Sequence, residues 1–289
     1  MHKERMSRIG EATISSIGFI LLMFGMMVIS SVLMNFVVTF GVTISAGIEG
    51  RQVLPNEISE LTESIFVMRM TSIVTGIFTI LALWLIFRKN WKVDTLWSMR
   101  NIPSTTWVLC IVLGLSLFLS LNLIFNISGL FELFPNDTEP HSRRMGHYPL
   151  LELLSVVILT PIVEEIIFRG AILRKFLKAN VNAHCSILIQ ALLFAAIHFG
   201  ILTGLFALIC GIVLGYIYVK FDSIWPVVIA HMSVNLTGVI LSILASSTQP
   251  YVVPSASVID VVVVVAVSLV VVILSFILLM RAKTNKGLF

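Results

Sequence analysis

The sequence predicts an all-α fold, a bundle of helices that span a membrane. Hydrophobic residues make up 58% of the 289 residues, and the mean hydropathy is +1.03. Charged residues make up only 12%, whereas a soluble domain usually carries about 25%. No long polar segment offers a second, soluble domain. We therefore expect a single polytopic membrane bundle.

Eight apolar runs are candidates for membrane-spanning helices, because a span needs about 20 such residues. The pair at 184–199 and 201–219 is the least regular, since the first run is short and only Gly200 clearly separates the two. We expect eight spans, although 184–199 could also form a tight hairpin or a partly re-entrant segment. The runs are 13–40, 65–87, 104–127, 149–173, 184–199, 201–219, 224–245 and 257–280.

The chain divides into three parts along these spans. Residues 1–148 hold the first three spans and their loops, residues 149–245 hold four spans, and residues 246–289 hold the last span and a short tail. The first apolar run is too long for the core of a signal peptide, and no small-residue cleavage site follows it. We expect it to stay in place as the first span.

The charges of the loops predict the orientation of this bundle. With the N-terminus inside, the loops on the cytoplasmic side hold fourteen lysines and arginines, and the opposite loops hold three. Cytoplasmic loops of membrane proteins carry such an excess, so both termini are expected in the cytoplasm. The three on the opposite side are Arg51, Arg143 and Arg144.

Several functions are disfavoured by composition. The net charge of +4 follows from the basic cytoplasmic loops, so it does not indicate a nucleic-acid partner. The three cysteines show no CxxC spacing, so neither a disulfide framework nor a zinc ribbon is indicated. His141 and His147 lie in a polar loop without helical spacing to a carboxylate, and we expect them to be solvated.

Six polar residues in the apolar runs of the central part are the candidate functional residues. Ionisable groups inside a membrane are costly to bury, so they are rare and usually functional. They lie in three short blocks, 161–170, 194–200 and 231–238, and supply two carboxylates, two imidazoles, a guanidinium and an amide. The residues are Glu164, Glu165, Arg169, His198, His231 and Asn235.

The first block separates two carboxylates by direction. Glu165 and Arg169 are four residues apart, so they share a helix face and can form an ion pair. Glu164 is rotated by about 100° from Glu165, so it points elsewhere. A buried pair that only fixes packing would explain Glu165 and Arg169 but not Glu164. We therefore expect Glu164 to face a cavity, where a desolvated carboxylate suits a general base.

The other two blocks supply hydrogen-bonding groups. His198 alone is more often a packing histidine than a catalytic one. His231 and Asn235 are four residues apart on one face, and two aligned donors can stabilise an oxyanion. The competing interpretation is an interhelical hydrogen bond, which is common for both residue types in membranes.

The ordered set resembles the CAAX protease and bacteriocin-processing (CPBP, Abi) family of intramembrane endopeptidases. The similarity covers about 150–240 and consists of a Glu-Glu-x-x-x-Arg block, a Phe-x-x-x-His block and a His-x-x-x-Asn block on successive apolar runs. The part at 149–245 is then the catalytic core. The residues that carry it are Glu164, Glu165, Arg169, Phe194, His198, His231 and Asn235.

The resemblance also implies roles. Glu164 would activate the water, Glu165 and Arg169 would support it, His198 would help to position the water, and His231 with Asn235 would hold the oxyanion. A divalent metal such as zinc fits two histidines and a glutamate, but the HExxH spacing is absent, and a metal-free glutamate mechanism uses the same residues. The involvement of a metal is left open, with a slight preference for a metalloprotease from family usage.

The sequence therefore predicts an intramembrane endopeptidase that cleaves a membrane-associated or lipidated peptide or protein. Short loops and a tail without a lipidation signal favour the cytoplasmic membrane of a bacterium, where relatives are associated with bacteriocin processing or immunity. The expected partners are the lipid bilayer and a peptide substrate. The alternatives are a non-catalytic immunity or peptide-transport protein that uses the same polar cavity, and a degenerate protease kept as a scaffold.

Overall fold

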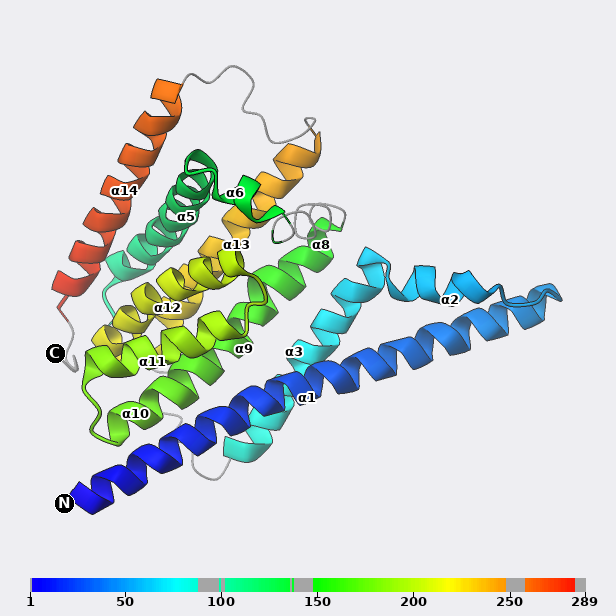
Figure 1. Ribbon diagram of the computed structural model, residues 1–289, viewed down its shortest axis with the longest axis horizontal. Helices are drawn as coiled ribbons and strands as arrows, with labels where there is room; N and C mark the ends of the chain where they lie inside the picture. Colours follow the sequence, from blue (N-terminus) through cyan, green and yellow to red (C-terminus); the bar gives the residue numbers. More distant parts are fainter. Residues whose placement is uncertain are drawn as a thin grey trace.

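A computed structural model describes residues 2–87, 99, 102–135, 137, 148–247 and 258–283. Every regular element in these ranges is helical, which confirms the all-α prediction (Figure 1). His141, His147 and the basic residues at 88–98 and 143–144 lie outside the described residues. The cytoplasmic location of both termini stays a prediction.

Six of the described helices are long and apolar enough to cross a membrane, judged by length and composition. They coincide with six of the eight predicted spans. The bounds of these helices are α1 His2–Glu49, α3 Ile65–Phe87, α5 Ser104–Ile127, α12 Ile201–Phe221, α13 Ile224–Ser247 and α14 Val258–Arg281.

The other two predicted spans are also helical, but neither is among these six. The run at 149–173 belongs to one continuous helix that alternates between α and π turns and is called the central helix below. The run at 184–199 forms α11, Ala183–Ala196, with 14 residues. The count of eight spans therefore remains a prediction. The central helix comprises α8 Pro149–Glu152, η1 Leu153–Leu159, α9 Thr160–Glu165, η2 Ile166–Leu173 and α10 Arg174–Lys178.

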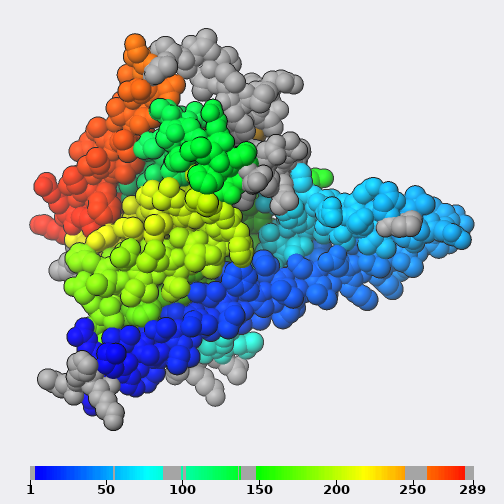
Figure 2. All heavy atoms as spheres, viewed as in Figure 1, coloured from blue at the N-terminus to red at the C-terminus, as the bar shows by residue number. Residues whose placement is uncertain are grey.

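The first helix is longer than the predicted span 13–40. α1 continues to Glu49 because no proline interrupts it, and Gly50 ends it with a positive φ of 67°, which glycine adopts without strain. The short helix α2, Pro55–Thr62, then leads into α3. The C-terminal end of α1 and the short helix α2 project from the rest of the bundle (Figures 1 and 2).

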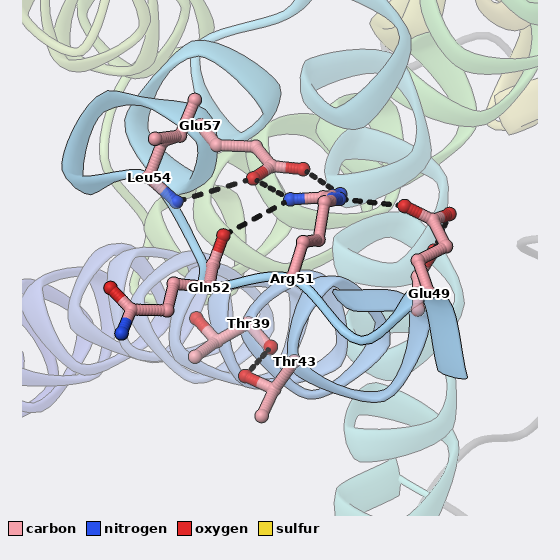
Figure 3. A network of polar contacts seen from close by, with 8 residues as sticks. Thr39, Thr43, Glu49, Arg51, Gln52, Leu54 and Glu57 are labelled. Carbon is pink, nitrogen blue, oxygen red and sulfur yellow. Dashed lines mark hydrogen bonds and ion pairs between the residues drawn. The ribbon is translucent and has the colours of Figure 1, made fainter. Parts of the chain in front are cut away.

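Arg51 holds the corner between α1 and α2. Its guanidinium donates to both carboxylate oxygens of Glu57 at 2.8 Å and to Glu49 at 2.6 Å (Figure 3). The same Glu57 carboxylate accepts the backbone N–H of Leu54 at the start of α2. The hydrogen bond from Arg51 lowers the pKa of Glu57, so this exposed clamp stays ionised at neutral pH.

The rest of the bundle packs through close helix pairs. α11 and α12 form an antiparallel hairpin, and α5 packs against both α13 and α14. A short helix, α6 at Leu130–Leu133, follows α5. The side chain of Asp137 reaches across to accept the backbone N–H of Leu202 at 2.9 Å, at the first turn of α12. Small residues allow these approaches: a Cβ on Gly211 of α12 would come within 3.0 Å of Ala191 on α11.

The tightest approach is between α5 and α13 at Gly114. A Cβ there would overlap the carbonyl oxygen of Ala230 and come within 2.7 Å of the Cβ of Ser233. We expect Gly114→Ala to destabilise the protein by about 1–3 kcal/mol, the usual cost of overpacking. Thermal unfolding in detergent would measure this. The matched control is Gly18→Ala on α1, where nothing lies within 4 Å and alanine favours the helix. Equal melting temperatures for the two variants would contradict this packing.

Candidate active site

The central helix presents the carboxylate pair at a change in its winding. Glu164 and Glu165 are the last residues of α9, and the π-helical turns of η2 follow directly. π turns are rare and occur frequently at functional sites. η2 is buried along its whole length, so the winding is held by the surrounding helices.

Glu165 is the centre of a buried polar network. One of its oxygens, Oε1, accepts from Nη1 of Arg169 at 2.7 Å and contacts Nδ1 of His231 at 2.7 Å. Arg169 also donates from Nη2 to the carbonyl of Gly211 on α12 at 3.3 Å. Glu165 and Arg169 have no solvent exposure. The predicted Glu165–Arg169 pair is confirmed, and it also binds α13 and α12 to the central helix.

This network determines how His231 presents its second nitrogen. Since Oε1 of Glu165 is a carboxylate acceptor, Nδ1 of His231 must carry the hydrogen in their contact. The Nε2 atom of His231 then points toward Glu164, whose Oε2 lies 3.6 Å away. The two carboxylates thus contact opposite nitrogens of one imidazole.

Glu164 differs from Glu165 in its surroundings. The Glu164 side chain is 12% exposed, whereas the Glu165 side chain is fully buried. Glu164 lines a cavity of about 760 Å³ that is also bounded by α1, α3 and the turn after α11. The predicted division between a paired carboxylate and one that faces a cavity therefore agrees with the structure.

His198 lines the same cavity but does not lie on a helix. α11 ends at Ala196, two residues earlier, so the expectation of a helical span to 199 is wrong at this end. Nδ1 of His198 contacts the carbonyl oxygen of Phe194 at 2.8 Å, and a carbonyl only accepts, so Nε2 is the free nitrogen. The Phe194 ring lies 4.6 Å from the His198 ring and 6.0 Å from the His231 ring, measured between centroids, and meets both in an edge-to-face arrangement.

Asn235 replaces a hydrogen bond that is missing from the backbone of the central helix. In η1 the N–H of Thr160 bonds to the carbonyl of Ser155, five residues earlier. By the same pattern the carbonyl of Val156 would pair with residue 161, but Pro161 has no N–H. The Asn235 amide donates to Val156 instead, at 2.9 Å. The interhelical hydrogen bond that competed with an oxyanion role is therefore present for one hydrogen of this amide.

Three buried polar residues were missed by the sequence analysis. Gln190 on α11 donates to the Gly211 carbonyl at 2.8 Å, the same oxygen that Arg169 contacts. Arg69 on α3 lies 3.9 Å from Glu152 of α8. Each is a single polar residue within an apolar run, and such isolation was a signal that could have marked them.

The candidate donors suit a metal ion in their chemistry but not in their placement. Their chemistry is suitable, since both imidazoles have Nδ1 engaged and Nε2 available, as metal-binding histidines do. Their placement is not: among the described residues, no three His, Cys, Asp or Glu side chains lie close enough together to hold one ion. In this arrangement the residues do not form a metal site.

The central part of the chain is similar to one known protein family. Residues 146–237 match the family described as "Type II CAAX prenyl endopeptidase Rce1-like". The resemblance to CAAX proteases is confirmed. The matched segment is less than half of the chain, but it contains the central helix, α11, α12 and all six candidate residues. No curated protein and no solved structure gave a significant match. The match supports a membrane protease that acts on a peptide or protein.

The Glu165–Arg169 pair gives a test of the network. We expect Arg169→Met to destabilise the protein by about 3–5 kcal/mol, because it leaves the Glu165 charge buried without its cation. Glu165→Gln combined with Arg169→Met should recover most of this loss, because no uncompensated charge remains. Thermal unfolding in detergent would measure both, with Arg8→Met on the exposed end of α1 as the control. A double variant that is less stable than Arg169→Met would contradict the pairing.

Proposed function

We propose that the protein is an intramembrane endopeptidase in which Glu164 is the general base. The observation that carries this proposal is the contrast between the two neighbouring carboxylates. Glu165 is fully buried and occupied by Arg169 and His231, whereas Glu164 lines the cavity. A base must reach the water that it activates, and of the pair only Glu164 meets this condition.

The proposed reaction needs only a water molecule and the residues of this site. Glu164 takes a proton from a water molecule held between its carboxylate and Nε2 of His198, and the water oxygen attacks the carbonyl carbon of the peptide bond. The tetrahedral intermediate then collapses, the C–N bond breaks, and Glu164 returns the proton to the leaving amine. No step passes through a metal ion.

The oxyanion requires donors, and two are proposed. Asn235 carries two amide hydrogens and donates one to Val156, which leaves one for the substrate oxygen. His231 can donate from Nε2 when both of its nitrogens are protonated. The Glu165 carboxylate accepts the hydrogen on Nδ1 and so fixes the orientation of this imidazole. Glu165 and Arg169 then act as positioning residues.

The substrate is proposed to be a membrane-associated or lipidated peptide or protein. The cavity beside Glu164 is bounded by helices long enough to span a bilayer, so a substrate that partitions into lipid would meet it. The basic loops and the short connections between helices support a location in the cytoplasmic membrane of a bacterium.

The role of Glu164 can be tested by substitution. We expect Glu164→Gln to lower the cleavage rate of a membrane-peptide library at least about a hundredfold, since glutamine keeps the shape but cannot accept the proton. The measurement is product formation by purified protein in detergent, followed by mass spectrometry.

The matched control is Glu60→Gln, which changes an exposed glutamate on α2 that does not line the cavity. It should cleave as the unchanged protein does, and both variants should keep their melting temperature. Cleavage that survives in Glu164→Gln would remove Glu164 as the base. A library that no variant cleaves would instead favour an immunity or peptide-binding protein.

The metal-free reaction gives a separate prediction. We expect activity to survive exhaustive treatment with EDTA and 1,10-phenanthroline, because the described donors do not converge on one ion. The cleavage assay and metal analysis of the same preparation would be read together. Activity that disappears with the chelator and returns with added zinc would show that the residues rearrange into a metal site.

A further inference from the structure

The cavity beside Glu164 has two walls of different chemistry. One wall is the face of α3 that carries Thr71, Ser72, Thr75 and Thr79, and the other is the face of α1 that carries several methionines. Thr62 and Glu63 also line the cavity, just before the start of α3. Glu164 and His198 line it on the side of the candidate active site. None of the described residues that line it is a lysine or an arginine.

The direction of the cavity follows from the register of two helices. Arg69 lies 3.9 Å from Glu152, and a Cβ on Gly76 would lie 3.2 Å from Leu159. From the first contact to the second, the residue number rises by seven on α3 and by seven on the central helix. The two helices therefore run in the same direction. Glu164, five residues beyond Leu159, therefore lies near the level of Thr79.

The length of the cavity suits an extended chain. Glu63 lies in the turn just before α3, and Ile65 and Thr79 are separated along α3 by fourteen positions, or about 21 Å at 1.5 Å per residue. An extended peptide advances by about 3.3 Å per residue, so this distance corresponds to about six residues. A chain that enters at Glu63 would reach Glu164 near the inner end.

The threonines of α3 present acceptors at a regular spacing. The hydroxyls of Thr71, Thr75 and Thr79 each donate to the backbone carbonyl four residues earlier, at 2.7–2.8 Å. A hydroxyl that donates in this way still has a lone pair with which to accept. Thr79 is fully buried, whereas Thr71 and Thr75 are half-buried and accessible from the cavity.

This spacing matches the backbone of an extended peptide. Positions four apart on a helix are about 6.0 Å apart along the axis. Alternate residues of a strand, whose N–H groups point to the same side, are about 6.6 Å apart. Two successive N–H groups on one edge of a peptide can therefore reach Thr71 and Thr75 together.

We propose that this cavity binds its substrate as an extended peptide, with alternate backbone N–H groups donating to the hydroxyl oxygens of Thr71 and Thr75. The proposal rests on the proposed function for what happens at Glu164, but not for the binding itself. The methionines opposite, such as Met23 and Met27, are flexible and fit varied side chains, so recognition is through the backbone and tolerates sequence.

A peptide suits this surface better than a lipid does. Acyl chains have no N–H groups to donate to the threonine oxygens. Phosphate headgroups are usually bound by lysine, arginine or a helix N-terminus, and no lysine or arginine is among the described lining residues.

The test uses backbone methylation, because an N-methyl group removes the donor without changing the side chain. The probe is a fluorescent decapeptide of alternating leucine and glutamine in three forms: unmethylated, methylated at every second nitrogen, and methylated at every nitrogen. Binding is measured by fluorescence polarisation on the Glu164→Gln protein in lipid nanodiscs, so that the peptide stays intact.

The unmethylated and alternately methylated peptides should bind alike, because one free edge is sufficient. The fully methylated peptide should bind roughly tenfold more weakly, as expected for two lost hydrogen bonds. Replacing Thr71 and Thr75 together by valine should weaken the first two peptides by a similar factor and leave the third unchanged.

The matched control is Thr43→Val. Thr43 lies on α1 outside the cavity, and its hydroxyl donates to the Thr39 carbonyl at 2.8 Å in the same way (Figure 3). Its replacement should not change binding. Equal binding of all three peptides, no binding of the unmethylated peptide, or an equal effect of Thr43→Val would each overturn the proposal. Binding that is sensitive to methylation without hydrolysis by the unchanged protein would keep this inference and reject the protease.

Discussion

The shared carboxylate oxygen of Glu165 is the contact on which the rest of the site depends. A carboxylate that is buried among apolar helices costs several kcal/mol unless other groups satisfy it. Oε1 of Glu165 contacts both Arg169 and His231, and Arg169 continues to the Gly211 carbonyl. One charge therefore ties the central helix to α13 and α12. It also decides which nitrogen of His231 is turned toward Glu164.

A defect in the central helix supplies the second link to α13. Pro161 leaves the Val156 carbonyl without a donor from the helix, and the Asn235 amide fills that position. His231 and Asn235 lie on the same face of α13, so one contacts the carboxylates while the other contacts the backbone. The residues that resemble catalytic donors thus also hold two helices in register, and structural and chemical roles are combined in the same side chains.

Several features were predictable because they depend on spacing within one helix. The Glu165–Arg169 pair follows from a separation of four residues, and six helices follow from the length of apolar runs. Other features depend on contacts between helices. The hydropathy of α1 and α3 is the same whether a face meets lipid or borders the cavity, so their part in it was not visible in the sequence. The end of α11 before His198 and the π turns also depend on neighbouring helices.

The length of α1 links this cavity to the bilayer itself. Its 48 residues extend over about 72 Å, whereas the hydrocarbon core of a membrane is about 30 Å thick. Such a helix must tilt strongly or leave the hydrocarbon at one end. Its tilt angle and the length of helix outside the hydrocarbon both change with bilayer thickness. Because α1 is one of the least buried candidate spans and forms one side of the cavity, a change in its tilt would move that side. Thicker and thinner membranes would therefore set different widths for the same cavity.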